Sequence, residues 1–212
     1  PKKVLQKVIR KPLLEIMLNR LNKSKNIDKI ILCTTLKKED DKLINFCKKN
    51  KLDFFRGSSE NVMSRYLNAA KKFKIKTIVR LTADCPLIDP YLIDIMINKF
   101  KKLNINYLAN TNPPHKSTYP DGTDIEIFDY DSFDKINKFE KRKEYLEHVT
   151  YNYWKEKKYI SLLYKNNKDW SNFRYTLDYE EDLKVLKKII NNFKENIDSV
   201  NTNKIVNFLK KN

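Results

Sequence analysis

The sequence contains very little glycine. Only two of its 212 residues are glycine, whereas about 7% is usual for proteins. A chain that uses glycine so rarely should keep it where a positive φ angle or a close backbone approach leaves no room for a side chain. The two positions are Gly57, in FFRGSSE, and Gly122, in YPDGTDIEIF. We therefore expect backbone constraints in these two segments.

Metal-type cysteine and histidine patterns are also missing. The three cysteines, Cys33, Cys47 and Cys85, include no CxxC pair, which argues against a zinc site and against a disulfide framework. With only His115 and His148 available, a histidine-rich metal site is excluded. The sequence shows no apolar run of about 18 residues and no leader with a cleavage site. We expect a soluble, cytoplasmic protein with reduced thiols and no membrane partner.

Positive charge is in excess, with 44 lysine and arginine residues against 27 aspartate and glutamate residues, and the formal net charge is +17. Such a charge would suit a nucleic-acid partner. The lysines, however, are scattered in pairs along polar faces of predicted helices, which is typical of solvated surface. No basic module with interleaved aromatic residues is recognisable. We therefore expect no nucleic acid, and keep a basic nucleic-acid-binding protein as an alternative that a salt-sensitive gel shift would reveal.

Apolar runs alternate with amphipathic stretches in the first half of the chain. Continuous apolar runs predict buried strands, and a 3.6-residue periodicity predicts helices. Asp89 followed by Pro90 is a strong helix start for 91–101, and Ser59 could cap the helix at 60–73. The predicted strands are 27–35, 52–55 and 77–82, and the predicted helices are 11–21, 39–50, 60–73 and 91–101.

The regular alternation of apolar runs and amphipathic stretches is lost in the second half of the chain. A loop rich in proline and asparagine is predicted at 110–122, with an antiparallel or edge strand at 123–128 after it. The remaining elements are helices at 144–157 and 179–193 and strands at 159–165 and 172–177. We predict an α/β fold with a mainly parallel sheet flanked by helices and a smaller antiparallel elaboration. A single domain is expected over 1–212, divided into a nucleotide-binding half (1–110), an elaboration (111–178) and closing helices (179–212).

The first predicted helix has no strand before it, and the chain begins with Pro1 instead of methionine. An α/β domain of this kind normally opens with a central strand and a phosphate-binding loop. We therefore expect that the opening strand is missing and that the sequence starts inside the protein.

Asp84 stands where ligands gather in open α/β sheets, just beyond the carboxyl end of a strand. It follows the apolar run TIVRLT and precedes Cys85 and Pro86. A carboxylate there can hold a divalent cation that in turn binds phosphate oxygens. The alternative is that Asp84 only caps a turn or helix.

The segment RLTADCPLIDP, together with FFRGSSENVMSRYLNAA, resembles the cytidylyltransferase-like sugar nucleotidyltransferases, especially the spore coat polysaccharide biosynthesis protein F type. These are related to the acylneuraminate and 3-deoxy-manno-octulosonate cytidylyltransferases. The resemblance covers nearly the whole chain in order. Its further motifs are PKKVL at 1–5, KPLL at 11–14, YPDG at 119–122, EHVT at 147–150, and RYTLD at 174–178 with EDL at 181–183.

This resemblance implies a Rossmann-like fold of the GT-A type and a role for each matching residue. It implies catalytic roles for Lys3, Asp84 and Asp178, with the two aspartates as Mg²⁺ ligands and Lys3 against the triphosphate. The alternatives are that Lys3 is a surface lysine and that Asp178 only caps the helix that follows. The nucleotide would also contact Arg56, Ser58 and Arg80, although Arg80 could instead belong to a framework ion pair. The sugar would contact Tyr119, Asp124, Glu126 and His148, although His148 could instead satisfy a buried polar network. A homodimer is a further expectation from the family.

The activity that the resemblance implies is attack of a sugar hydroxyl on the α-phosphate of CTP, with release of pyrophosphate, for cell-surface polysaccharide biosynthesis. Positioning and charge neutralisation suffice for such a transfer, so no general base is assigned. The sequence departs from the family pattern at Lys2 and Arg10, where glycine is usual, and at Leu146, where arginine is frequent. Because the phosphate loop is mostly absent, we expect little turnover from this chain and pyrophosphate release from an N-terminally extended protein.

A glycosyltransferase that uses a nucleotide-sugar on the same kind of sheet is the main alternative. Such enzymes usually bind metal through Asp-x-Asp on one turn, whereas the turn here, Ala83–Pro86, has a single acid. The sequence itself chooses neither the base nor the sugar. Cytosine rests on the resemblance, and the acceptor is either a nonulosonic acid or a simpler sugar or sugar alcohol phosphate.

Overall fold

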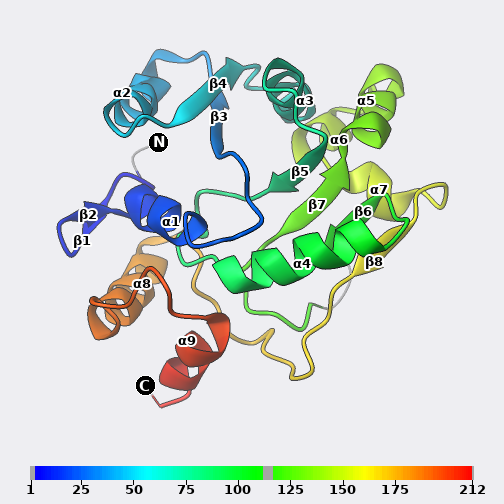
Figure 1. Cartoon of the computed structure of the whole chain (residues 1–212). Helices are drawn as coiled ribbons and strands as arrows, with labels where there is room; N and C mark the ends of the chain where they lie inside the picture. Colours follow the sequence, from blue (N-terminus) through cyan, green and yellow to red (C-terminus); the bar gives the residue numbers. More distant parts are fainter. Residues whose placement is uncertain (1–2, 112–116, 212) are drawn as a thin grey trace.

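The computed structural model describes residues 3–111 and 117–211 (Figure 1). Its strands are β1 (Lys7–Val8), β2 (Lys11–Pro12), β3 (Ile31–Thr35), β4 (Asp53–Gly57), β5 (Thr77–Arg80), β6 (Tyr107–Ala109), β7 (Glu126–Asp129) and β8 (Ser161–Leu163). Its helices are α1 (Leu13–Leu21), the 3-10 helix η1 (Lys38–Asp40), α2 (Asp41–Lys49), α3 (Val62–Lys72), α4 (Pro90–Lys102), α5 (Tyr130–Phe139), α6 (Lys143–His148), α7 (Tyr151–Lys155), α8 (Glu180–Asn192) and α9 (Thr202–Leu209).

The strands combine parallel and antiparallel pairs. β3 and β4 are parallel neighbours, and a second sheet has the strand order β5-β7-β6-β8. β7 is antiparallel to both of its neighbours, while β6 and β8 are parallel. The predicted α/β class is therefore confirmed, and so is the antiparallel strand of the second half. That strand lies between β5 and β6, where it is covered on both faces and at both edges.

Successive side chains of the central strands point into different cores, as the two-residue period of a strand requires. Leu108 and Ile127 pack with α1 and α4 on one face. Tyr107 and Phe128 pack with α3 and α5 on the other face. Figure 1 shows α4 running along one side of the sheet, with α3 and α5 on the opposite side. The sheet is thus the middle of three layers.

A third apolar cluster joins the two ends of the described chain. Val8 and Leu13, near the beginning, pack with buried residues of α8 and α9 near the end. Leu87, from the segment after β5, belongs to the same cluster. Figure 1 shows the consequence, since both termini lie on the same side of the molecule.

The start of α4 follows the sequence prediction, but the start of α3 does not. The Asp89 carboxylate accepts hydrogen bonds from the backbone N–H groups of Tyr91 and Leu92, and Pro90 is the first helical residue, as predicted. At α3 the cap is Asn61, whose side chain accepts from the N–H of Ser64, and not Ser59. The helix begins two residues later than predicted because this amide oxygen satisfies the N-terminal donors.

Three predicted elements of the second half are shorter than expected. The single helix predicted at 144–157 is two helices, because Val149 adopts φ 62° and is fully buried in the core beneath them. The strand predicted at 159–165 is reduced to β8. The strand predicted at 172–177 pairs only through one isolated bridge, between Asp121 and Arg174. Packing, which a local pattern does not report, sets these limits.

A hairpin of β1 and β2 gives a physical meaning to one departure from the family pattern. Ile9 and Arg10 connect the strands with φ 48° and 66°. Positive φ angles favour glycine, and glycine is the residue that the family pattern has in place of Arg10. Lys2, the other such departure, and residues 112–116 of the predicted loop lie outside the described residues.

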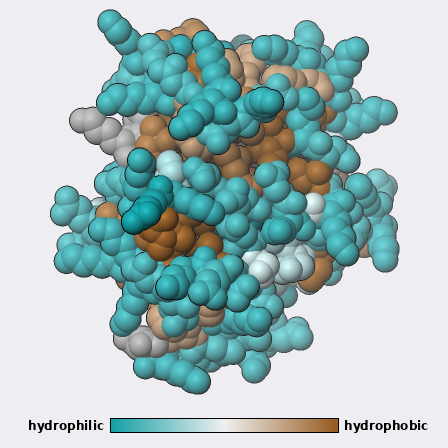
Figure 2. Space-filling model, turned by 60° about the vertical axis from the view of Figure 1, so that its left-hand side comes forward, coloured by the Kyte–Doolittle hydropathy of each residue, from teal (hydrophilic) through white to brown (hydrophobic). Residues whose placement is uncertain are grey.

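The surface agrees with the interpretation of the charge pattern. The lysine pairs at 48–49, 71–72, 101–102 and 157–158 are all exposed. Figure 2 shows hydrophilic side chains over most of one face, with apolar surface confined to hollows between them. In 3–111 and 117–211, no helix is long and apolar enough to cross a membrane.

Candidate active site

Residues from widely separated segments line a cavity of about 660 Å³. Lys3, Asp84 and Asp178, the three residues for which the sequence predicts catalytic roles, are all part of its wall. The other lining residues are Val4, Thr34, Glu39, Asp40, Lys42, Leu43, Ala83 and Leu177. The cavity therefore lies at the carboxyl ends of β3 and β5, where an α/β sheet binds its ligands.

The loop after β5 presents Asp84 to this cavity. Its first turn is closed by a hydrogen bond of 3.1 Å from the Cys85 N–H to the Thr82 carbonyl oxygen. The hydroxyl of Thr176 donates to the carbonyl oxygen of Asp84 at 3.2 Å. These bonds hold the backbone, so the half-buried carboxylate of Asp84 keeps its place at the cavity wall.

Arg20 fixes the rest of that loop from below. Its side chain is fully buried, and its guanidinium donates to the carbonyl oxygens of Ile88 at 2.8 Å and Leu87 at 3.1 Å. It also donates to the carbonyl oxygens of Ile197 and Val200. Burial lowers the pKa of Arg20, and the nearby Asp89 opposes that shift. One arginine thus ties the loop of Asp84 to the turn before α9.

Asp178 reaches the cavity from the segment before α8. The ammonium group of Lys3, 175 residues away in sequence, donates to the Asp178 carbonyl oxygen. Arg174 donates to one carboxylate oxygen of Asp178 at 2.6 Å. The Asp182 carboxylate accepts from the Asp178 N–H at 2.7 Å, so the backbone here is held as firmly as that of Asp84. A hydrogen bond from Arg174 lowers the pKa of Asp182 to about 2, although burial opposes the shift.

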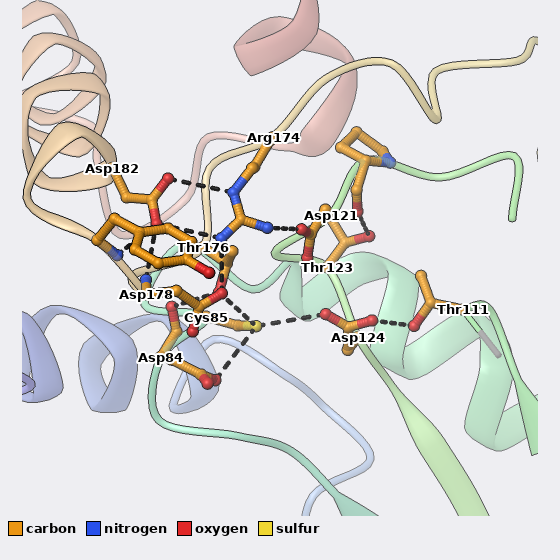
Figure 3. Close-up of polar contacts among 12 residues, drawn as sticks. Asp84, Cys85, Thr111, Asp121, Thr123, Asp124, Arg174, Thr176, Asp178 and Asp182 are labelled. Carbon is orange, nitrogen blue, oxygen red and sulfur yellow. Dashed lines mark hydrogen bonds and ion pairs between the residues drawn. The ribbon is translucent and has the colours of Figure 1, made fainter. Parts of the chain in front are cut away.

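A turn at residues 119–124 lies beside the segment that leads to Asp178, although none of its residues lines the cavity (Figure 3). Gly122 adopts φ 106°, and a Cβ atom there would lie 2.7 Å from the backbone nitrogen of Thr176. The glycine therefore allows the turn to lie directly against the segment that leads to Asp178. Gly57, the other glycine, has no positive φ, but its Cβ would meet Arg65 at 3.0 Å. The expected backbone constraint is confirmed at Gly122, whereas at Gly57 only side chains approach the glycine.

Cys85 lies between the carboxylates of Asp84 and Asp124. Its sulfur is 3.6 Å from Asp84 Oδ1 and 3.5 Å from Asp124 Oδ2 (Figure 3). Burial raises the pKa of the thiol well above its usual value, and the two carboxylates raise it further. The thiol therefore stays protonated and is a hydrogen-bond donor. Thr111 donates to the other oxygen of Asp124.

Glu126 and Arg80 bind each other below the cavity. Their side chains form an ion pair that is largely buried. The Tyr107 hydroxyl donates to Glu126 at 2.7 Å, and the Thr150 hydroxyl donates at 2.5 Å. This arrangement uses the Glu126 carboxylate inside the fold. It agrees with the framework alternative for Arg80.

Apart from Lys3, Asp84 and Asp178, none of the predicted site residues lines the cavity; those outside it are Arg56, Ser58, Arg80, Tyr119, Asp124, Glu126 and His148. Arg56 donates to Asp41 and to two backbone carbonyl oxygens. The Ser58 hydroxyl accepts from backbone N–H groups at the start of the next turn. Tyr119 is buried in the core on the α4 face, and His148 is exposed and stacked on Tyr151.

The residues at the cavity fit a magnesium ion that is shared with a nucleotide. Within the described ranges, no group of three or more histidine, cysteine, aspartate or glutamate residues could enclose a metal ion. Magnesium seldom needs such a cage, because it is commonly bound by one or two carboxylates plus phosphates and water. Asp84 and Asp178 supply that number of carboxylates at one cavity.

Several residues with clear contacts at the site received no role from the sequence. Arg174, Thr176 and Asp182 belong to the recognised RYTLD and EDL motifs, so a signal for them existed. Asp121 is part of the YPDG motif. Arg20 gave no signal, since an arginine within an amphipathic helix is normally a solvated residue.

Comparison with known proteins places these motifs in one family. The sequence model of the cytidylyltransferase family matches residues 1–206. A solved structure of a cytidylyltransferase from Leptospira borgpetersenii superimposes with a TM-score of 0.92 at 34% identity, covering 100% of this chain and 88% of that one. The predicted nucleotidyltransferase-type fold is thereby confirmed.

Two curated relatives complete the comparison. An uncharacterised protein of Methanocaldococcus jannaschii is 33% identical over 99% of this chain and 84% of its own length. The spore coat polysaccharide biosynthesis protein SpsF of Bacillus subtilis is 35% identical over 54% of this chain and 49% of its own length. The resemblance seen in the sequence is confirmed.

Proposed function

This chain belongs to the cytidylyltransferase family, and from that premise we propose that it transfers the cytidylyl group of CTP to a sugar or a nonulosonic acid. The enzyme class, nucleotidyltransferase, follows from the family. The likeness to a protein of spore coat polysaccharide biosynthesis supports an activated sugar for a cell-surface glycan as the product.

One observation carries the proposal. Lys3, Asp84 and Asp178 come from the beginning, the middle and the end of the chain and line the same cavity. A cation and two carboxylates are what transfer of a phosphoryl-type group requires, since its catalysis consists mostly of positioning and charge neutralisation. A nucleophilic triad is not needed.

The reaction would proceed by a single displacement. The hydroxyl oxygen of the sugar forms a bond to the α-phosphorus while the bond from that phosphorus to the bridging oxygen breaks. Pyrophosphate leaves with the electron pair, and the hydroxyl proton passes to solvent. Asp84 and Asp178 would hold Mg²⁺, which when bound neutralises charge on the phosphate oxygens. Lys3 would bind a phosphate oxygen, and Asp124 would accept a hydrogen bond from a sugar hydroxyl.

The contacts described above decide which predicted residues enter the proposal. Arg80 and Glu126 are assigned to the framework, because each satisfies the other inside the fold. Arg56 is assigned to the support of the β3–β4 pair, since it donates to Thr35 and Lys37 carbonyl oxygens. Cytosine recognition is proposed from the family alone.

A screen of pyrophosphate release tests the proposal. The full-length protein is combined with Mg²⁺, each of the four nucleoside triphosphates in turn, and a panel of sugars, nonulosonic acids and sugar alcohol phosphates. We expect release with CTP and one acceptor class, and a large loss in Asp178→Asn. Asp134→Asn, which changes a half-buried carboxylate that is paired with Lys138 and does not line the cavity, is the matched control and should not change the rate. Transfer from a UDP-sugar without pyrophosphate release would favour the glycosyltransferase alternative and refute the proposal.

The proposal also includes a homodimer in the cytoplasm, where CTP is made. Apolar side chains are exposed in the second-half elaboration, with Phe139 at 83% and Ile160 at 59% of full exposure. Burial of such side chains in a second copy would remove them from water. Sedimentation equilibrium should give twice the chain mass, and Phe139→Asp should shift it toward the monomer. A monomeric wild-type protein would contradict this part of the proposal.

A further inference from the structure

Arg174 is surrounded by carboxylates from three parts of the site (Figure 3). It donates to Asp121 through Nη1, to Asp178 through Nη2 at 2.6 Å, and to Asp182 through Nε and Nη2 at 3.1 Å each. The planar guanidinium group allows such a fork of contacts, which a lysine could not make. A single side chain therefore touches the sugar-side turn, the proposed metal carboxylate and the cap of α8.

The backbone reinforces the link between Arg174 and the turn. The Asp121 N–H donates to the Phe173 carbonyl oxygen at 3.0 Å, and the Tyr175 N–H donates to the Asp121 carbonyl oxygen at 2.9 Å. Asp121 and Arg174 are thus bridge partners as well as an ion pair. Any change in the strength of that ion pair acts directly on residues 119–124, which carry Asp124.

Negative charge exceeds positive charge at this point. Three carboxylates share one guanidinium, so the guanidinium charge neutralises each carboxylate only in part. A cation on Asp178 would relieve this competition, because Asp178 would then attract the guanidinium less. The pair of Arg174 with Asp121 would become correspondingly stronger.

We infer that Arg174 is a positioning residue that couples cation binding at Asp178 to ordering of the sugar-side turn at residues 119–124. The inference rests on the proposed function, since the cation is the one assigned there to Asp178. Metal and nucleotide binding would then prepare the place of Asp124 before the sugar arrives. By linkage, ordering of the turn would raise the cation affinity by the same factor.

Arg142 offers a matched control. It also bridges two carboxylates, donating to Glu140 at 2.6 Å and Glu156 at 2.7 Å. Neither Arg142 nor its partners line the cavity. A general effect of losing an arginine cluster would appear in Arg142→Ala as well, whereas the proposed coupling would be lost only at Arg174.

The test combines two measurements that do not depend on turnover. Electron paramagnetic resonance of free Mn²⁺ gives the cation affinity in the presence of CTP, and hydrogen exchange gives the protection of the amides of 119–124. In the wild type and in Arg142→Ala, Mn²⁺ with CTP should raise that protection several-fold. In Arg174→Ala the rise should disappear while Mn²⁺ still binds, because removal of the guanidinium leaves the Asp178 carboxylate free for the cation.

Arg174→Lys and chemical rescue keep the result interpretable if the alanine variant folds poorly. The lysine variant retains the charge but not the fork, so it should bind Mn²⁺ while losing most of the protection. Methylguanidinium should restore protection to Arg174→Ala and leave Arg174→Lys unchanged. Full metal-dependent protection in either variant would overturn the inference while leaving the proposed function intact. A wild-type protein that binds no Mn²⁺ with CTP would overturn both.

Discussion

Two arginine clusters of this protein differ in their balance of charge. Arg80 lies opposite Glu126, whose carboxylate also accepts from two buried hydroxyl groups. Burial alone would lower the pKa of Arg80, but the charge of Glu126 outweighs it and raises the pKa. The two charges of this pair therefore balance each other. It holds β5 and β7 together at the register Arg80 opposite Glu126.

The Arg174 cluster has an excess of acid and lies at the cavity. Burial raises the pKa of Asp121, and the charges of Asp124 and Asp178 raise it further against the effect of Arg174. Carboxylates that remain short of positive charge are suited to a cation that arrives with the substrate. In this protein, the local balance of charge distinguishes the acidic residues of the framework from those of the candidate site better than the mere presence of acidic residues does.

The largest effect should come from the cavity beside the Arg174 cluster. Asp84→Asn should lower kcat roughly 10³-fold, because it removes a proposed cation ligand where charge develops. The fold should be unaffected, since the bond from Thr176 is to the Asp84 backbone. Pyrophosphate release and a thermal melt check the two statements. Unchanged kcat in a folded variant would remove Asp84 from the mechanism.

Substitutions in the charge-balanced pair of Arg80 and Glu126 should change the stability of the protein and not its reaction rate. Arg80→Met leaves the Glu126 carboxylate buried without its ion-pair partner, which should lower the free energy of unfolding by about 3 kcal/mol. Combining Arg80→Met with Glu126→Gln should recover much of that loss, because the amide keeps the two hydroxyl contacts. Urea unfolding measures both. Equal losses in the single and double variants would show that the pair is not a closed unit.

The turn at residues 119–124, which contributes Asp121 to the Arg174 cluster, should be destabilised by any side chain at Gly122. Gly122→Ala should cost about 2 kcal/mol of stability, because φ is 106° and the Cβ would meet backbone atoms at 2.7 and 2.8 Å. Gly57→Ala is the comparison, since its Cβ would meet mainly a flexible arginine side chain. We expect a smaller loss there by urea unfolding. The reverse order would show that the turn can move away from Tyr175 and Thr176.

The smallest effect concerns a second charge-balanced cluster, in which Arg142 and Lys158 pair with Glu140 and Glu156. A hydrogen bond from Arg142 lowers the pKa of Glu140 to about 2, although burial opposes it, whereas an unfolded glutamate has a pKa near 4.3. The resulting stability is therefore present above about pH 4.3 and is lost as pH falls toward 2. Glu140→Gln should cost about 1 kcal/mol at pH 7, discounted for the half-exposed Arg142. Urea unfolding at pH 7 and pH 3 should show this difference shrinking, and a pH-independent difference would contradict it.

Local patterns predicted the elements best where one residue controls the backbone. Asp89 with Pro90 fixed the start of α4 because a carboxylate at that position satisfies the first helical N–H groups. The prediction of one helix at 144–157 was wrong, because a buried valine with positive φ interrupts it. A periodic pattern of apolar residues does not reveal such an interruption.

The candidate site was partly accessible from the sequence. Ordered motifs indicated Lys3, Asp84 and Asp178, and the structure brings these three to one cavity. The same motifs assigned Glu126 and Asp124 to the same role as sugar ligands. An alternating strand segment does not reveal which of its acidic residues will form an ion pair with an arginine. Only the pairing of β7 with β5 places Glu126 opposite Arg80.

By itself, the sequence determined the α/β class, the order of most elements and the family, since apolar periodicity, capping residues and ordered motifs are local properties. The tertiary structure decided which charges are satisfied. Arg20 became a buried support for the loop of Asp84, and Arg174 became the shared partner of three acids. These outcomes depend on contacts between residues up to 180 positions apart, and the chain must fold before such charges can meet.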